Sequence, residues 1–266
     1  MDEGKIRQLA GLLAGAGRTT FFGGAGMSTE AGIPDFRSAG GLYSRDTGLA
    51  ATAEEVLSSG FLESHPREFY RFYRENLLHP EVSPGPAHRA LAWLETAGYL
   101  TGVITQNIDG LHQLAGSRRV LELHGTVHEN FCTSCGKTSD LEAMLTGDPV
   151  PVCPACGGTL RPRVVLYGEP LDPGIWLEAE TLVRQADLLL VGGTSLAVWP
   201  AASLAESFRG TLVILNREPT PLDARAELVF REPAGQVLEA VVCDAMLIMI
   251  GVGGFGAIIS ANPDWM

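Results

Sequence analysis

The pattern that most constrains this chain of 266 residues is a series of short apolar segments rich in β-branched and aromatic residues. Most of them alternate with longer segments of helical periodicity, such as residues 4–15, 86–98 and 199–208. Strands that are apolar on both faces and separated by helices are typical of a parallel sheet covered on both sides. We therefore expect an α/β fold with a doubly wound parallel sheet. Its expected strands are residues 18–24, 100–107, 119–125, 163–169, 186–193, 211–216 and 226–230.

Two segments interrupt this alternation. Residues 40–85 contain aromatic helical sequence without an expected strand, and residues 127–161 contain paired cysteines. We expect both segments to form a second, smaller domain, with a ligand cleft between the two domains. The predicted division assigns residues 1–39, 86–126 and 162–244 to the larger domain, residues 40–85 and 127–161 to the smaller one, and residues 245–266 to an apolar tail of unknown role.

Composition and charge limit the class of partner. The formal net charge is −12 at pH 7, which argues against nucleic-acid binding, because such proteins need a dense basic surface. The charge would suit a cationic partner such as a lysine-rich tail, although a solvated acidic surface is the simpler explanation. The N-terminal segment does not have the pattern of a secretory signal, and five cysteines, four of them in pairs, favour a reducing compartment. We expect a cytoplasmic location.

The apolar tail does not have the pattern of a good membrane anchor. Residues 245–261 are uncharged, contain four glycines, fall short of a comfortable membrane span and lack flanking Lys or Arg. We therefore favour a docked or mobile tail over membrane insertion.

Four cysteines have the spacing of a zinc ribbon. Cys132 and Cys135 form one Cys-x-x-Cys pair, and Cys153 and Cys156 form a second pair after seventeen intervening residues. Four thiolates close a tetrahedral shell and leave no position for water or substrate, so one structural Zn²⁺ is predicted. The alternatives are a redox dithiol or a chance spacing. Cys243 lies in the last expected helix, and we expect it to be buried there.

A glycine-rich turn follows the first expected strand. Gly24, Ala25 and Gly26 fit the start of a dinucleotide-binding fingerprint, but Thr29 stands at its third glycine position and the next strand does not end in an acidic residue. Glycines before a helix N-terminus predict a phosphate site, whereas a tight turn without a ligand is the alternative. The nearby Pro-Asp-Phe-Arg segment, residues 34–37, indicates that a ring is held beside the phosphates; a surface loop with a local Asp–Arg ion pair is the alternative.

Polar side chains gather at the expected strand ends, where parallel sheets bind ligands. Each of them alone could be a turn or cap residue, but together they predict one crevice. They are Gln106, Asn107, Asp109, His112, His124, Gly193, Thr194, Ser195 and Asn216. His124 is the candidate general base, because imidazole titrates near neutral pH. We expect the histidines outside the strand ends to be surface or packing residues; they are His65, His79, His88 and His128.

These motifs, in this order, closely resemble the sirtuins of bacterial type, which are NAD-dependent protein-lysine deacylases. The resemblance covers roughly residues 5–243. It is carried by the cysteine pairs and by the segments GAGMSTEAGIPDFRS, TQNIDGLH, LELHGT, RPRVVLYGE, GGTSLAVWPAA and LNREPTPLD. It implies a Rossmann-like larger domain, a smaller domain with a helical part and a zinc ribbon, and a cleft in which NAD and acyl-lysine meet.

The resemblance also implies roles for individual residues. Catalytic roles fall to His124, as general base, and to Asn107. Residues matching the NAD site are Gly24, Ala25, Gly26, Ile33, Asp35, Phe36, Arg37, Gln106, Asn107, Ile108, Asp109, Gly193, Thr194, Ser195, Asn216, Arg217 and Glu218. The acyl-lysine peptide would pair in β-fashion with an edge formed by Val165, Leu166, Tyr167 and Gly168.

The implied reaction needs no protein nucleophile. The acyl oxygen attacks the ribose carbon as nicotinamide leaves, a ribose hydroxyl deprotonated with the help of His124 attacks the resulting imidate, and water completes the formation of 2′-O-acyl-ADP-ribose and free lysine. The Tyr-x-x-Arg pair of members that prefer acidic acyl groups is absent, because Tyr73 stands three positions after Tyr70. We therefore expect uncharged acyl groups, although Arg71 and Arg74 could still reach an acidic one. Mono-ADP-ribosyl transfer and a non-catalytic NAD-sensing module are the alternative functions.

Overall fold

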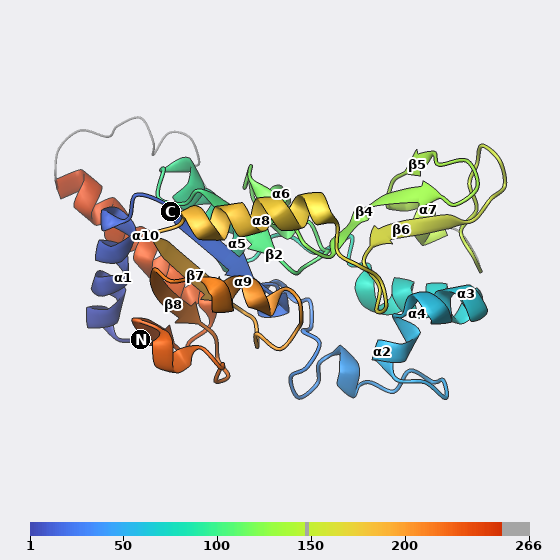
Figure 1. The fold of residues 1–266 in the computed structure, drawn as a ribbon, viewed down its shortest axis with the longest axis horizontal. Helices are drawn as coiled ribbons and strands as arrows, with labels where there is room; N and C mark the ends of the chain where they lie inside the picture. The colour runs from blue at the N-terminus through green and yellow to red at the C-terminus, as the bar shows by residue number, and fades with distance from the viewer. Residues whose placement is uncertain (147–148, 252–266) are drawn as a thin grey trace.

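The computed structural model describes residues 1–146 and 149–251 of the chain (Figure 1). Most of the segment predicted to be an apolar tail therefore lies outside the described residues. Within the described chain, no helix is both long and apolar enough to cross a membrane.

A six-stranded parallel sheet forms the centre of the larger domain. Its strand order is β3-β2-β1-β7-β8-β9, and every neighbouring pair is parallel. The chain runs outward in both directions from β1 and β7, so the topological switch point, where such folds bind ligands, lies between these two strands. Six of the seven expected strands are confirmed in this sheet. They are β1 (Thr19–Gly23), β2 (Gly102–Thr105), β3 (Val120–Glu122), β7 (Leu188–Gly192), β8 (Thr211–Leu215) and β9 (Leu228–Phe230).

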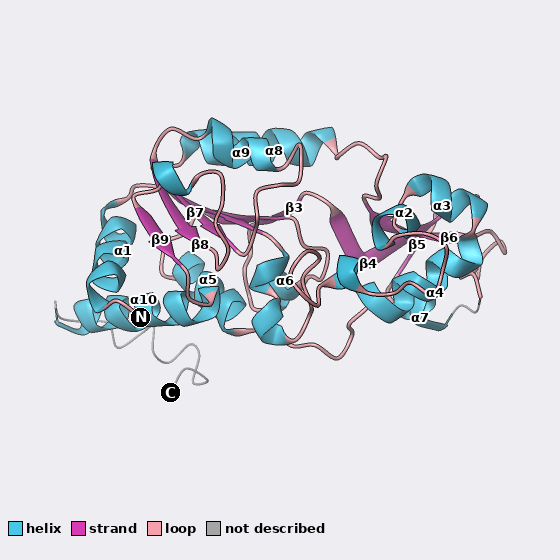
Figure 2. Cartoon of the chain, turned by 90° about the horizontal axis from the view of Figure 1, so that it is seen from below, coloured by secondary structure: helices cyan, strands magenta, loops and turns pink. Residues whose placement is uncertain are grey.

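Helices cover both faces of this sheet, as Figure 2 shows. One face packs against α1 (Glu3–Gly15), α5 (Pro86–Thr96) and α10 (Ala234–Gly251); the other packs against α8 (Pro173–Gln185) and α9 (Ala202–Ser207). Consecutive strand residues alternate between the two cores: Phe21 lies in the first core and Phe22 in the second, and both are fully buried. This two-sided burial explains why the strands are continuous apolar segments. The expected doubly wound, Rossmann-like sheet is confirmed.

The smaller domain combines short helices with a three-stranded antiparallel sheet of order β5-β4-β6. Its core includes Phe69, Tyr70, Phe72 and Tyr73 from one face of the longest of these helices. Its elements are η3 (Leu42–Ser44), α2 (Ala53–Val56), α3 (Ser59–Ser64), α4 (Pro66–Leu77), β4 (Gly125–Cys132), β5 (Thr138–Ser139), α7 (Glu142–Thr146) and β6 (Leu160–Val164). Figure 1 shows this domain beside the larger one along the long axis of the molecule.

Two expectations about individual segments are wrong. The apolar segment 163–169 does not join the parallel sheet; its start belongs to β6, which pairs antiparallel with β4. The burial of β6 alternates, with Arg163 exposed, so the strand is half-buried. Cys243 is exposed rather than buried, because α10 directs Val241 and Val242 inward and the next residue outward. The expected domain boundaries at residues 126/127 and 161/162 fall inside β4 and β6.

Candidate active site

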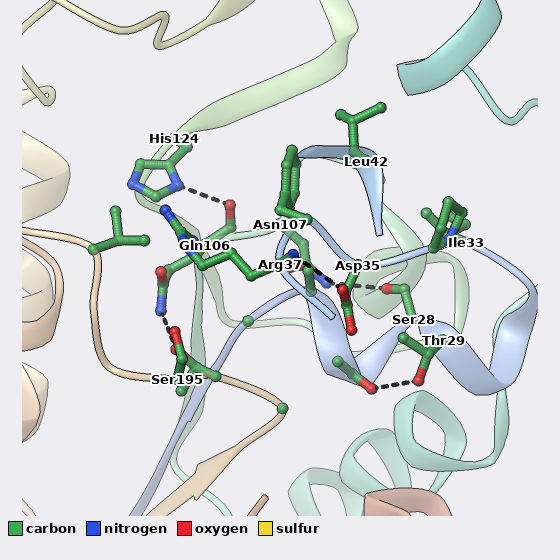
Figure 3. A pocket seen from close by; sticks show the side chains of 18 of the residues that line it. Ser28, Thr29, Ile33, Asp35, Arg37, Leu42, Gln106, Asn107, His124 and Ser195 are labelled. Atoms are coloured by element: carbon green, nitrogen blue, oxygen red, sulfur yellow. Dashed lines mark hydrogen bonds between the residues drawn. The ribbon is translucent and has the colours of Figure 1, made fainter. Parts of the chain in front are cut away.

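A cleft of about 730 Å³ lies at the carboxyl ends of the central strands, between the two domains. Its size is that of a typical site for a small ligand or cofactor. Every residue that we predicted for the catalytic, NAD and peptide roles lines this cleft, and Figure 3 shows several of them. The topology therefore brings together side chains from segments that are far apart in the sequence. The individual roles of these residues remain predictions.

His124 is fixed in one orientation by the turn after β3. Its Nδ1 lies 2.9 Å from the backbone carbonyl oxygen of Gln106, and its own carbonyl oxygen accepts the Val165 N–H at 2.9 Å (Figure 3). Since a carbonyl can only accept, Nδ1 carries the proton, and Nε2 of the neutral ring keeps a free lone pair. Burial lowers the pKa of His124 below 6.5, while the hydrogen bond to Gln106 acts in the opposite direction. The imidazole is therefore neutral and basic at neutral pH.

Ser28 connects the side chains of the Asn107–Asp109 loop. Its Oγ donates to Asp109 Oδ2 at 2.6 Å and accepts from Asn107 Nδ2 at 3.0 Å. His88 Nε2 lies 3.4 Å from the same Oγ, and Nδ1 of that ring accepts the Gly85 N–H at 3.2 Å. Burial lowers the pKa of His88 to about 4. His88 is fully buried, which agrees with the expectation of a packing residue. The sequence analysis assigns no role to Ser28, although its position within the GAGMSTEAG motif is a signal for one.

The glycine turn after β1 differs from the expected phosphate cradle. It continues into two short 3₁₀ turns, η1 (Ala25–Met27) and η2 (Thr29–Ala31), instead of a long helix. The N–H groups of Gly24 and Gly26 donate to the carbonyls of Gly192 and Gly193 at 3.1 and 2.8 Å. A Cβ atom at Gly26 would lie 2.7 Å from the Gly193 Cα. The glycines therefore allow two loops of the protein to pack, and within the described chain the Ala25 N–H has no protein acceptor and remains available to a ligand.

The segment that follows folds back over the cleft. Asp35 Oδ1 accepts the backbone N–H groups of Arg37 and Ser38 at 3.1 and 2.8 Å, so it closes a turn. The alternative of a local Asp–Arg ion pair is wrong, because the Arg37 guanidinium lies 3.9 Å from Glu54. The same guanidinium stacks over the Tyr43 ring, 5.2 Å from the ring centroid.

The Tyr43 hydroxyl is hydrogen-bonded to the Tyr167 hydroxyl. Burial and this bond to Tyr167 raise the pKa of Tyr43 well above its usual range. Both tyrosines line the cleft, so this hydrogen bond links residues 43 and 167 in its wall.

The backbone of the predicted peptide-binding edge is largely paired within the protein. Tyr167 donates its N–H to Leu57 and accepts the Ser59 N–H, both at 3.0 Å. The Val165 N–H is bonded to His124, as described above. Among the described residues, Gly168 has neither its N–H nor its carbonyl paired. Within the part of the chain that the structure describes, the Val165 carbonyl also has no donor.

Two further residues that are predicted for the NAD site make side-chain contacts. Gln106 Nε2 donates to Thr194 Oγ1 at 3.1 Å, linking the ends of β2 and β7. Asn216 Nδ2 donates to the Glu218 carbonyl at 2.8 Å, so its Oδ1 is the atom left for a ligand.

Two histidines lie elsewhere than expected. His112 does not line the cleft: it is 1% exposed and stacks edge-on against His88, with ring centroids 4.7 Å apart. Neither ring nitrogen of His112 has a hydrogen-bond partner within the described residues. His79, expected on the surface or in packing, lines the cleft.

The four paired cysteines form one cluster in the smaller domain. Their sulfur atoms all lie within 4.8 Å of one another, and none of these cysteines forms a disulfide. Sulfur atoms bound to one tetrahedral Zn²⁺ lie about 3.8 Å apart. The Sγ atoms of Cys132 and Cys156 lie 3.4 Å apart, and those of Cys135 and Cys153 lie 3.8 Å apart. The cluster therefore has the size of a Cys₄ zinc site.

The backbone around the sulfur atoms also fits this metal. Each Cys-x-x-Cys turn is followed by a glycine of positive φ, Gly136 or Gly157, whose N–H returns to the first cysteine carbonyl at 2.9 Å. Backbone N–H groups also point at the sulfur atoms: Ser134 donates to Cys132 Sγ and Gly158 donates to Cys156 Sγ, both at 3.4 Å. This favours the thiolate that binds zinc.

A Rossmann-like sheet with a cleft at its switch point and a Cys₄ ribbon inserted beside it together define a dinucleotide-binding α/β protein with a structural zinc module. Residues 24–200 match the model of the Sir2 family. The chain belongs to this family.

Similar proteins agree with this assignment. A protein of Cutibacterium acnes named NAD-dependent protein deacetylase is 54% identical. The match covers 88% of this chain and 96% of the Cutibacterium protein. A Clostridium perfringens protein of the same name is 46% identical, over 91% of this chain and 100% of its own.

Solved Sir2 structures have the same fold. One with a p53 peptide and NAD⁺ is 39% identical, with a TM-score of 0.80 over 91% of this chain and 99% of its own. A Sir2 variant with a deacetylated p53 peptide and 3′-O-acetyl-ADP-ribose is 38% identical, with a TM-score of 0.83. The match covers 90% of this chain and 98% of the chain of that structure.

Proposed function

We propose that this protein is an NAD-dependent protein deacetylase, which removes acetyl groups from lysine side chains and produces nicotinamide, 2′-O-acetyl-ADP-ribose and free lysine. The orientation of His124 carries the proposal, since it leaves one basic nitrogen in a cleft of cofactor size. The relatives named as NAD-dependent protein deacetylases, and the Sir2 structures with NAD⁺ and with an acetyl-ADP-ribose, support the same reaction.

In this reaction the side chain of His124 has one chemical task. NAD supplies an activated ribose carbon that takes up the acyl oxygen as nicotinamide leaves. With Nδ1–H held by Gln106, Nε2 of His124 accepts the proton of a ribose hydroxyl, which becomes the nucleophile toward the acyl carbon. A base held in a single orientation is effective because no rotation has to precede the proton transfer.

The other residues of the cleft bind and orient. We assign Asn107 and Asp109 to the nicotinamide side, where Ser28 holds both side chains in place. Gly168 offers backbone groups to the peptide that carries the acyl-lysine. The Cys₄ cluster would hold one Zn²⁺ away from the chemistry, because four thiolates leave no open coordination position.

We further propose a preference for uncharged acyl groups. Tyr73, at the position where an arginine would bind an acidic acyl group, is fully buried in the core of the smaller domain. Arg71 and Arg74 line a separate hollow with Arg67, Glu68, Glu75 and Pro149, and do not line the cleft.

A mass-spectrometric assay tests the reaction and the preference together. The protein is incubated with NAD and matched peptides that carry acetyl-lysine or succinyl-lysine. Nicotinamide and acetyl-ADP-ribose should form, with acetyl-lysine consumed faster than succinyl-lysine. His124→Ala should slow the reaction about 100-fold or more, in line with loss of a general base. ADP-ribosylated protein without acetyl-ADP-ribose would indicate transferase activity instead, and no NAD consumption would indicate an NAD sensor.

We also propose a cytoplasmic location. The four clustered cysteines form no disulfide with one another, and a reducing compartment favours cysteines kept in this state.

A further inference from the structure

His128 makes a contact that its position in the sequence did not indicate. It lies in β4, where the pairing with β6 shifts register between Thr126 and Asn130. Such irregularities redirect side chains out of the regular alternation of a strand. Here the His128 Nε2 lies 2.9 Å from the backbone carbonyl oxygen of Asp109. A carbonyl only accepts, so the imidazole is the donor.

This bond is one of three by which residues 124–128 hold residues 106–109. His124 Nδ1 donates to the Gln106 carbonyl at one end of the loop. The Val127 N–H donates to the Ile108 carbonyl at 3.0 Å, and His128 donates to the last carbonyl. The first of these three contacts comes from the proposed base itself. The third comes from a side chain that does not line the cleft.

The packing around His128 confirms how closely the ring lies against the loop. Gly110 has φ = 70°, and a Cβ atom there would lie 2.6 Å from the His128 ring. The imidazole therefore rests directly on the Gly110 backbone. His128 is exposed, so filling a core cannot explain these contacts. Its two contacts in this loop are to Asp109 and Gly110.

We propose that His128 is a positioning residue for the nicotinamide side of the cleft. By fixing the Asp109 carbonyl and covering Gly110 from outside, it holds the loop that carries the side chains of Asn107 and Asp109. This inference rests on the proposed function, which assigns that loop to nicotinamide.

Steady-state kinetics of His128 variants test the proposal. His128→Ala should raise the KM for NAD and the inhibition constant of nicotinamide about fivefold, the effect of losing about one hydrogen bond. Its kcat and melting temperature should stay close to the original values. His128→Gln keeps an N–H donor of similar reach and should recover most of the affinity. His65→Ala, at an exposed histidine away from the cleft, is the matched control and should change neither constant.

A purely structural role of His128 would instead lower the melting temperature and kcat together and leave KM unchanged. That result would overturn the proposal, as would equal KM values for His128→Ala and the unmodified protein. A His128→Gln variant as impaired as His128→Ala would rule out the hydrogen bond as the cause.

Hydrogen–deuterium exchange separates this inference from the proposed function, because it requires no turnover. In His128→Ala, the amides of residues 106–112 should exchange about fivefold faster, whereas those of β7 should not change. Unchanged exchange would overturn the positioning role even in an active enzyme. If the unmodified protein consumes no NAD but the exchange changes as expected, only the proposed function fails.

Discussion

At the scale of single residues, some side chains in the cleft use one polar atom in a hydrogen bond within the protein and keep a second polar atom available to a ligand. His124 has its Nδ1 committed to a carbonyl, and Asn216 has its Nδ2 committed to another. Each therefore presents a known atom to a ligand: a lone pair in the first case and an amide oxygen in the second. Such commitment orients a side chain without requiring it to be buried in a core.

The pH dependence of the reaction should reveal the protonation state of His124. Because burial lowers its pKa, the residue stays neutral down to a pH below 6.5 and loses its basic nitrogen only under more acidic conditions. We expect kcat/KM to fall on the acid side with a midpoint below 6.5. The profile is measured with saturating acetyl-lysine peptide and varied NAD. A midpoint above 6.5 would contradict this environment for the imidazole.

The residues assigned catalytic, NAD and peptide roles from motif position all line the cleft, but motif position did not predict their partners. Ser28 and His88 are sixty residues apart and meet only because α5 packs beside the turn after β1. His112, by contrast, belongs to the TQNIDGLH motif and still lies outside the cleft, because α6 (Leu111–Leu114) turns its side chain toward the core. The direction in which a helix points a side chain, which a motif does not encode, therefore places His112 outside the cleft.

At the scale of elements, the zinc ribbon supports the edge of the cleft. β4 begins directly after His124 and ends at Cys132, and β6 ends at Val164, beside the predicted peptide edge. The two strands pair antiparallel between these points. The metal cluster therefore lies at the far end of the same pair of strands whose near end carries the proposed base.

Loss of one zinc ligand should unfold the smaller domain. In Cys132→Ser, the remaining three thiolates would bind Zn²⁺ more weakly, and the site contributes to folding only when the metal is bound. We expect less than one zinc per chain by elemental analysis and a lowered melting temperature. Cys243→Ser, on the exposed face of α10, is the control and should retain its zinc. Equal zinc contents in the two variants would exclude the cluster as the metal site.

At the scale of the whole molecule, the larger domain buries two histidines that bind a proton less readily in the folded state than in the unfolded state. Burial holds the pKa of His112 well below 6.5, with the positive charge of a protonated His88 as a further cause, and burial lowers the pKa of His88 to about 4. In the unfolded chain both would titrate near 6.5. At these two histidines the unfolded state therefore binds more protons than the folded state in the acidic range, whereas burial raises the pKa of Glu122 to about 7 and acts in the opposite direction.

The free energy of unfolding should accordingly decrease as the pH falls from about 6.5 toward 4. Each histidine contributes up to about 1.4 kcal/mol per pH unit in this range. His112→Phe removes one such group and should reduce the slope, whereas His65→Phe, at an exposed site, should leave it unchanged. Urea denaturation at several pH values measures both slopes. Identical slopes for His112→Phe and the unmodified protein would contradict the role of this buried histidine.

The sequence alone determined the class of fold and the cysteine cluster, and its motifs indicated part of the lining of the cleft through their resemblance to a family. Local periodicity and spacing encode the first two: strands buried on both faces are continuously apolar, and two cysteine pairs specify a tetrahedral shell. Only the tertiary structure decided that segment 163–169 begins in an antiparallel hairpin, that the glycines of the first turn pack against Gly193, and that His128 reaches the Asp109 carbonyl. These features depend on contacts between segments distant in the chain, and no local pattern specifies them.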